Sequence, residues 1–207
     1  MRTLQWLGTL GAVVGLGTLA VAIGAMFRSV SRPAQYTEGH ARSLLRIPVL
    51  GVFTVLFAGA LVILWRPLPW APAAWLRLAL ALAGLALIIL GTGLYLWGLW
   101  TLGVSFAPSS GMGVRLQAGH RLVTDGPFAY MRHPMYLGVI LTCVGTLPLY
   151  LTWASLALAV TMFGLVVRAR REERVLEAQY GAEWRRYAAR VPAWLPRCGQ
   201  RDTQSQA

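Results

Sequence analysis

The chain contains no lysine and few charged residues of either sign. Only 13% of its 207 residues are charged, whereas an ordinary soluble domain has about a quarter. The hydrophobic fraction is 57% and the mean hydropathy is +0.56. Uncharged runs from Trp6 to Phe27 and from Leu78 to Gly103 exceed the roughly 20 residues needed to cross a bilayer. The sequence therefore excludes a soluble fold and predicts a polytopic membrane protein. The first run lacks a small-residue cleavage site before its polar flank, so we expect a retained span.

Cysteine and the usual metal-ligand spacings are also scarce. The two cysteines, Cys143 and Cys198, are far apart and in different surroundings, which excludes a disulfide framework. His120 and His133 are separated by more than three helical turns, and the chain has no HxxxH or CxxC motif, so we expect no metal site. A GxSxG nucleophile motif is missing too, which disfavours a serine hydrolase.

The net charge of +12 comes entirely from arginine. No basic stripe interleaved with exposed aromatic residues is present, so nucleic-acid binding is disfavoured, whereas membrane-flanking loops explain the charge well. With the N-terminus outside, Arg2, Arg66 and Arg77 face out, while every other arginine and all seven acidic residues face in. The positive-inside rule therefore predicts an outer N-terminus and a cytoplasmic C-terminus. A basic chain without lysine is typical of a GC-rich bacterial genome, so we expect a multi-pass protein of the bacterial inner membrane.

The apolar pattern predicts an all-α fold with about five transmembrane helices, and the polar segments described below indicate a cytoplasmic cofactor pocket. Pro148 and Tyr150 separate the last two spans, which we expect to form a tight helical hairpin. Close spacing of Gly11, Gly15 and Gly17 in the first span suggests tight helix contact, although a generic glycine-rich span fits equally well. The predicted spans are Leu4–Phe27, Ile47–Trp65, Leu76–Leu102, Met135–Leu151 and Thr152–Val167.

An amphipathic helix from Arg168 to Ala189 is expected after the fifth span. The prolines beyond it end regular structure, and the polar end of the chain is typical of a disordered tail. We divide the chain into three membrane helices (1–102), a C-terminal core with the polar loop, the hairpin and the amphipathic helix (103–197), and the tail (198–207).

Two polar segments, His120–Gly138 and Arg168–Glu173, flank the predicted hairpin and therefore share the cytoplasmic side. Pro134 suits the first turn of a helix, whose unpaired amides attract a carboxylate. Arg168 and Glu172 are four residues apart and share a helix face. Glutamate suits an ammonium group, and aromatic rings suit a cation or an adenine. This mixture matches a cofactor that carries an amine, a carboxylate, a sulfonium and an adenosine group.

Three blocks in this order resemble the isoprenylcysteine carboxyl methyltransferase family, within the wider group of phospholipid methyltransferases. They are HRLVTDGPFAYMRHPMYLG (120–138), the glutamate pair with its preceding arginine (168–173) and YGAEWRRYAARVPAWLP (180–196). The resemblance covers about residues 100–197. It implies an integral-membrane enzyme that uses S-adenosyl-L-methionine and has no Rossmann domain.

The resemblance also implies roles for individual residues. Glu172 would bind the cofactor's ammonium group, and Arg168 would meet the acceptor's carboxylate. In one departure, Gly113 stands where members of the family can carry a cofactor-contacting glutamine. The residues that match the family's cofactor contacts are His120, Arg121, Leu122, Val123, Phe128, His133, Pro134, Met135, Tyr136 and Glu172.

The acceptor is expected to be lipophilic and to enter from the bilayer, either as a small molecule or as a lipidated substrate. Arg168 favours a carboxylate, as in isoprenylcysteine O-methylation, and a carboxylate needs no general base because it is already ionised at neutral pH. A phospholipid amine or a small thiol would need deprotonation, for which Glu173 or His133 is a candidate. Other interpretations are a membrane scaffold or transporter, and a membrane reductase with a nicotinamide cofactor.

Overall fold

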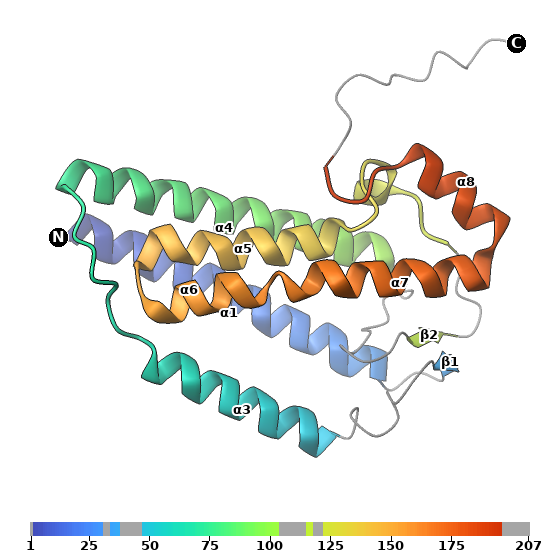
Figure 1. Ribbon diagram of the computed structural model, residues 1–207, viewed down its shortest axis with the longest axis horizontal. Coiled ribbons are helices and arrows are strands. Elements are labelled where there is room, and N and C mark those ends of the chain that lie inside the picture. The colour runs from blue at the N-terminus through green and yellow to red at the C-terminus, as the bar shows by residue number, and fades with distance from the viewer. Residues whose placement is uncertain (1, 31–33, 38–46, 104–114, 118–121, 196–207) are drawn as a thin grey trace, which may run out of the picture.

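A computed structural model gives the arrangement of the chain and describes residues 2–30, 34–37, 47–103, 115–117 and 122–195 (Figure 1). The predicted all-α fold is confirmed, with one short exception. Strand β1 (Ala34–Thr37) pairs antiparallel with β2 (Arg115–Gln117), which the sequence did not predict. The helical elements are α1 (Arg2–Val30), α3 (Ile47–Ile63), α4 (Ala74–Leu102), the short 3-10 helix η2 (Gly126–Ala129), α5 (Pro134–Tyr150), α6 (Trp153–Thr161), α7 (Gly164–Tyr180) and α8 (Ala182–Arg190).

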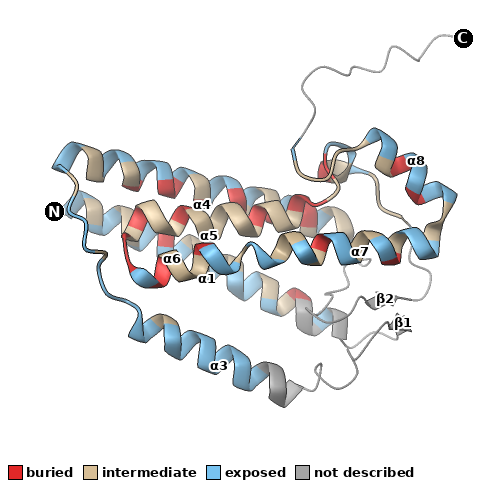
Figure 2. Ribbon diagram, in the orientation of Figure 1, coloured by how far each residue is buried: buried red, intermediate tan, exposed pale blue. Residues whose placement is uncertain are grey.

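The chain is an integral membrane protein. Three stretches are long and apolar enough to cross a bilayer, Arg2–Ala25, Ala74–Leu102 and Trp153–Tyr180, and the last of these joins α6 to α7. Two shorter apolar helices, Gly51–Ile63 and Pro134–Tyr150, accompany them. Figure 2 shows α3 almost wholly exposed, and its large side chains are apolar. Such a surface is stable against lipid, where all backbone polar groups are satisfied within the helix.

The closest helix contact in the bundle joins α4 and α5, which run antiparallel. A Cβ atom added at Gly91 would lie 2.5 Å from the Gly138 carbonyl oxygen, and one added at Gly138 would lie 2.7 Å from the Gly91 carbonyl oxygen. The pair Gly84 and Gly145 repeats this arrangement two turns away, with 2.6 and 2.7 Å. The two backbones therefore touch, as small residues permit in membranes. This contact fixes the position of α5, whose first turn belongs to the polar segment His120–Gly138.

Helix α1 packs on the α4–α5 pair through a small apolar core. Ala81, Ile88 and Leu149 are its buried residues. Gly11 makes room for the Leu149 side chain, and this part of the predicted glycine contact is confirmed. The predicted contact is wrong for Gly15 and Gly17, which face open space. Among these three glycines, only Gly11 lies opposite a large side chain of α5.

The predicted hairpin between α5 and α6 is confirmed and turns within two residues. Leu151 ends α5 in a left-handed conformation with a φ of 52°. Thr152 and Ser155 then cap α6 reciprocally, each side chain bonding to the other's backbone amide. Arg77 of α4 donates to the Leu149 carbonyl at 2.7 Å and so satisfies an oxygen that the end of α5 leaves unpaired.

This end of the bundle also holds the connector between α3 and α4, because the Trp153 amide donates to the Arg66 carbonyl at 3.0 Å. Arg66 and Arg77, predicted to share one side of the membrane, therefore lie at one end. The start of α5, the charged half of α7 and all of α8 lie at the opposite end (Figure 1).

The predicted single helix from Arg168 to Ala189 is wrong in both its start and its continuity. Helix α7 already begins at Gly164, so the predicted fifth span covers α6 and the first turn of α7. Gly181, with a φ of 51°, ends α7, and α8 folds back from it (Figure 1). The turn is favoured because α8 buries Trp184 and Tyr187, which a straight helix would carry away from the bundle.

Candidate functional site

The two polar segments meet where the first turn of α5 lies beside the middle of α7. The Tyr136 hydroxyl donates to Glu172 Oε2 at 2.6 Å, and Arg168 Nε donates to the same hydroxyl oxygen at 3.0 Å. The Arg168 guanidinium also lies over the Tyr136 ring, 5.7 Å from its centroid. Because Arg168 and Glu172 are one helical turn apart on α7, a single tyrosine reaches both. These three residues form the Tyr136 cluster.

The neighbouring carboxylate, Glu173, serves different partners. His133 Nε2 lies 2.8 Å from Glu173 Oε1, and Arg132 Nε lies 3.4 Å from the same oxygen. The His133 side chain is only 5% exposed, so this bond is shielded from competing water. The two adjacent glutamates thus point to different sides of α7. Glu173 holds the residues that precede α5, while Glu172 belongs to the Tyr136 cluster.

The chain that follows α8 crosses the same two residues and bonds to their backbone. The Arg132 amide donates to the Pro192 carbonyl at 2.9 Å, and the His133 amide donates to the Ala193 carbonyl at 3.1 Å. The Trp194 ring lies 5.4 Å from the His133 ring, centroid to centroid. The amides just before α5 are therefore already satisfied. The anion attraction expected at this helix start therefore belongs to its first turn, to which His133, the N-cap residue, makes no side-chain capping bond.

Helix α8 reaches the polar block from the other side. The Tyr187 hydroxyl donates to the Phe128 carbonyl at 2.8 Å, and the Arg132 guanidinium lies 5.8 Å from the centroid of the Trp184 ring. Burial raises the pKa of Tyr187 to about 12, so its hydroxyl keeps its proton and remains a donor at neutral pH. The sequence analysis assigned no role to Trp184, Tyr187 or Trp194. The signal was present in the aromatic pair three residues apart on a charged helix, which marks a buried face.

The other predicted cofactor residues surround these contacts. Pro134 is buried at the first position of α5, and Met135 packs against Gly98 of α4. Phe128 is half-buried in η2. The partly buried Leu122 and Val123 open the described segment, whereas His120, Arg121 and Gly113 lie outside the described residues.

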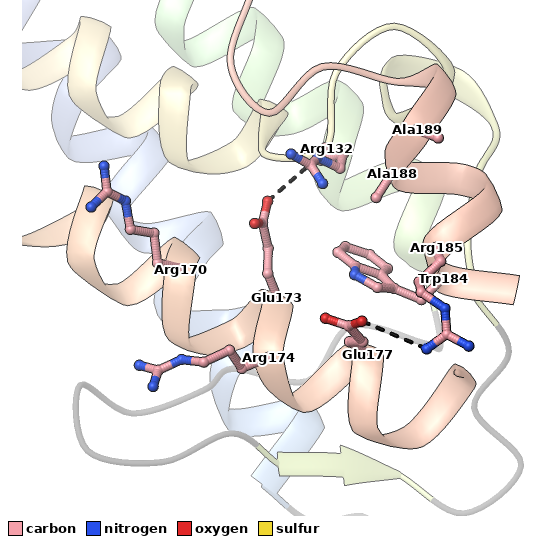
Figure 3. Close-up of a pocket in the computed structure, with 9 residues that line it drawn as sticks. All are labelled: Arg132, Arg170, Glu173, Arg174, Glu177, Trp184, Arg185, Ala188 and Ala189. Atoms are coloured by element: carbon pink, nitrogen blue, oxygen red, sulfur yellow. Dashed lines mark ion pairs between the residues drawn. The ribbon is translucent and has the colours of Figure 1, made fainter. Parts of the chain in front are cut away.

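A polar cavity of about 410 Å³ lies between α7 and α8 (Figure 3). It shares Arg132 and Glu173 with the contacts above but none of the residues of the Tyr136 cluster. Its lining consists of Arg132, Arg170, Glu173, Arg174, Glu177, Trp184, Arg185, Ala188 and Ala189.

The arrangement combines a carboxylate, a guanidinium and a helix N-terminus at the edge of an apolar bundle. A carboxylate at Glu172 suits a cationic group, and the start of α5 suits an anionic one. Fold and side-chain contacts together define an integral-membrane protein with a polar cluster at one end of its apolar helices. Comparison with known families narrows this class further.

The family model for phospholipid methyltransferases matches residues 79–183, just over half of the 207 residues, and the chain belongs to this family. The match begins in α4, upstream of the motifs that carried the resemblance in the sequence. The predicted resemblance is confirmed.

Curated relatives agree with this family. Over 115 residues the chain is 36% identical to protein-S-isoprenylcysteine O-methyltransferase B of Arabidopsis thaliana, a match that covers 55% of this chain and 57% of that protein. It is 32% identical over 120 residues to the Homo sapiens protein-S-isoprenylcysteine O-methyltransferase, covering 56% and 41% of the two chains. It is also 34% identical over 102 residues to the cobalt-zinc-cadmium resistance protein CzcN of Cupriavidus metallidurans, covering 46% and 47%. The chain thus spans about half the length of the curated relatives it matches.

Proposed function

We propose that this protein is an integral-membrane methyltransferase that uses S-adenosyl-L-methionine and acts on a lipophilic acceptor. The observation that carries the proposal is the Tyr136 cluster, in which one hydroxyl group joins the two motifs of the family at the membrane-adjacent end of the bundle. The names of the plant and human relatives, both isoprenylcysteine O-methyltransferases, support the same reaction class.

The donor set of the site fits the proposed cofactor. Glu172 offers a carboxylate for an ammonium group, and the positive end of the α5 helix dipole suits a carboxylate. Phe128 and Tyr136 offer aromatic faces for an adenine ring or a sulfonium. When bound, the cofactor supplies an activated methyl group on a sulfonium sulfur. We further propose that His120, Arg121, Leu122 and Val123 contribute to this pocket from the preceding segment, with Pro134 and Met135 at its floor.

The favoured acceptor is a carboxylate on a lipid or a lipidated substrate. Arg168 is partly buried, and a guanidinium matches a carboxylate in shape and charge. A carboxylate is ionised at neutral pH, so its oxygen is nucleophilic without a base. The protein's contribution is then to hold acceptor and methyl group in line and to exclude water, and such positioning supplies several kcal/mol of barrier reduction, about 7 to 11 in well-oriented model reactions.

A second candidate acceptor is an amine or a thiol, which must lose a proton. The hydrogen bond between His133 and Glu173 favours this alternative, because a histidine held by a carboxylate is a common general base.

We propose an inner-membrane location in a bacterium, with the N-terminus outside and the site on the cytoplasmic side. The acceptor then enters laterally from the bilayer, and residues 103–197 form the methyltransferase core. Replacing the exposed Arg66 by cysteine in a Cys143→Ser/Cys198→Ser background, which removes both native cysteines, tests the orientation. A membrane-impermeant maleimide should label this cysteine in intact cells. If the cysteine is not labelled, the orientation is opposite to the one proposed.

The function is tested by a methyl-transfer screen. Purified protein in lipid vesicles receives cofactor with a labelled methyl group and separate pools of prenylcysteine, phospholipid and small thiol acceptors. We expect label in a base-labile ester of the carboxylate pool, and loss of this turnover in Arg168→Ala with cofactor binding largely kept. Transfer of label to none of the pools contradicts the proposed activity, and equal loss of binding and turnover contradicts the acceptor role of Arg168.

A further inference from the structure

The cavity between α7 and α8 faces away from the Tyr136 cluster. Its α7 residues, Arg170, Glu173, Arg174 and Glu177, stand at positions i, i+3, i+4 and i+7 and so form one helix face. Figure 3 shows Arg170 and Arg174 on the α7 side and Trp184 with Arg185 on the α8 side. The cavity is therefore separate from the proposed cofactor pocket, although both abut Glu173.

The lining carries four arginines and two glutamates, an excess of two positive charges. Glu173 is already bound by His133 at 2.8 Å. Glu177 lies 3.7 Å from Arg185 in an exposed pair, a type of contact that contributes little free energy. Glu173 is thus engaged by His133, and Glu177 is only weakly paired with Arg185. Because the four arginines leave a net positive charge, the cavity attracts an anion.

Arg132 gives a second reason to expect an anion in the cavity, because one of its donor atoms makes no hydrogen bond to the described residues. Its Nε atom is buried and makes no hydrogen bond to any described residue. Glu173 Oε1 lies 3.4 Å from it and attracts it as an ion pair. A buried donor without an acceptor costs free energy that a bound acceptor would restore.

The depth of the cavity matches that of lipid headgroups. Val167 is the last apolar residue before the charged half of α7, and at 1.5 Å per residue Arg170 and Arg174 lie about 5 and 10 Å beyond it along the helix. The headgroup layer occupies roughly 5 to 8 Å on each side of the hydrocarbon core. Arg170 therefore lies within the headgroup layer, and Arg174 lies just beyond it, where its long side chain can still reach a phosphate group.

We propose that this cavity binds the phosphate group of an anionic membrane lipid. The Arg185 guanidinium would meet the phosphate beside the Trp184 ring, and the Arg170 and Arg174 guanidinium groups, which extend from the far side of α7 in Figure 3, would turn toward it. A lipid bound here bridges α7 and α8, and it presses α8 onto the Arg132–His133 segment. This inference does not depend on methyl transfer, because it concerns a different cavity and is measured by binding.

The test is calorimetric titration of the full chain in a neutral maltoside detergent. The probe is dihexanoyl phosphatidylglycerol below its micelle concentration, with dihexanoyl phosphatidylcholine and inorganic phosphate in separate arms. We expect the anionic lipid to bind, and its affinity to fall at least about tenfold in Arg174→Gln/Arg185→Gln, which removes one guanidinium from each wall. The matched control is Arg171→Gln/Arg186→Gln, which makes the same charge change at exposed positions of the same two helices that do not line the cavity.

Each outcome decides one point. Retained affinity in the control and loss in the cavity variant support the site, and competition by inorganic phosphate at similar concentration would identify free phosphate as a sufficient ligand. Equal loss in both variants would show diffuse surface attraction and overturn the proposal. Equal binding of phosphatidylcholine, or the absence of any binding heat, would overturn it as well. Thermal unfolding of both variants confirms that each is folded.

Discussion

Tyr136 links two segments that are more than thirty residues apart in the chain. Its hydroxyl group donates to Glu172 and accepts from Arg168, so it orders both the proposed ammonium ligand and the proposed acceptor ligand. The sequence predicted that Arg168 and Glu172 share a helix face, because that follows from their spacing. It did not predict that one phenol joins them, since this depends on how deeply α5 and α7 approach each other.

Tyr136→Phe removes this hydroxyl group and keeps the ring. Hydrogen bonds to charged groups contribute about 1.5 to 3 kcal/mol, so the affinity for S-adenosylhomocysteine should fall about ten- to a hundredfold. Equilibrium dialysis with the labelled compound measures the change. Tyr150→Phe is the matched control, because it removes a hydroxyl group that donates to Gly8 at the opposite end of the bundle. Unchanged affinity in Tyr136→Phe would exclude the cluster from the cofactor site.

The Tyr187 hydroxyl group contributes to the free energy of unfolding by an amount that depends on pH. Burial raises its pKa from 10.0 to about 12, so folding favours the neutral phenol. This stabilisation is complete below the unfolded pKa and is lost as the pH rises through the folded one. At neutral pH, Tyr187→Phe should lower the free energy of unfolding by about 1 kcal/mol, the contribution of one hydrogen bond. The difference should shrink at a pH of about 11, as measured by denaturant unfolding in detergent. A difference that grows with pH would contradict the buried hydroxyl bond.

The hydrophobic pattern of the sequence predicted the bounds of the membrane helix α4 closely. The predicted span Leu76–Leu102 corresponds to α4 (Ala74–Leu102), because an unbroken apolar run can only be helical in a bilayer. The pattern failed beyond Arg168, where amphipathic periodicity continues through Gly181 although the chain turns there. The turn depends on contacts that α8 makes with the start of α5 and with η2, and no local signal encodes those contacts fully.

The glycine contact between α4 and α5 sets the position of the site. A Cβ atom at Gly91 would lie 2.5 Å from the Gly138 carbonyl oxygen, whereas one at Gly93 meets nothing within 4 Å. Gly91→Ala should therefore destabilise the bundle by about 1 to 3 kcal/mol through overpacking. Gly93→Ala on the same helix should be neutral or slightly stabilising, because alanine favours helix more than glycine does. Thermal unfolding in detergent compares the two, and equal stability would show that the helices do not touch at Gly91.

The two ends of the helix bundle carry different groups of polar residues. One end holds the hairpin turn and Arg77, which caps it, and the other gathers the start of α5, the charged half of α7 and α8 (Figure 1). The arginine distribution in the sequence predicted this separation, because the hairpin returns the chain to the side it left. The packing of the segment after α8 over the Arg132–His133 amides was not predicted, since irregular chain has no periodicity to read.

Calorimetric titration of S-adenosylhomocysteine into the purified chain tests most directly whether these segments form one cofactor site. The native chain should bind with a dissociation constant in the micromolar range, and Glu172→Ala should weaken binding at least about tenfold, because a charged partner of the ammonium group is lost. Glu183→Ala, at an exposed position in the first turn of α8, should bind as the native chain does. Absence of binding heat from the native chain, or equal affinity in Glu172→Ala and Glu183→Ala, would contradict a cofactor site at the junction of α5 and α7.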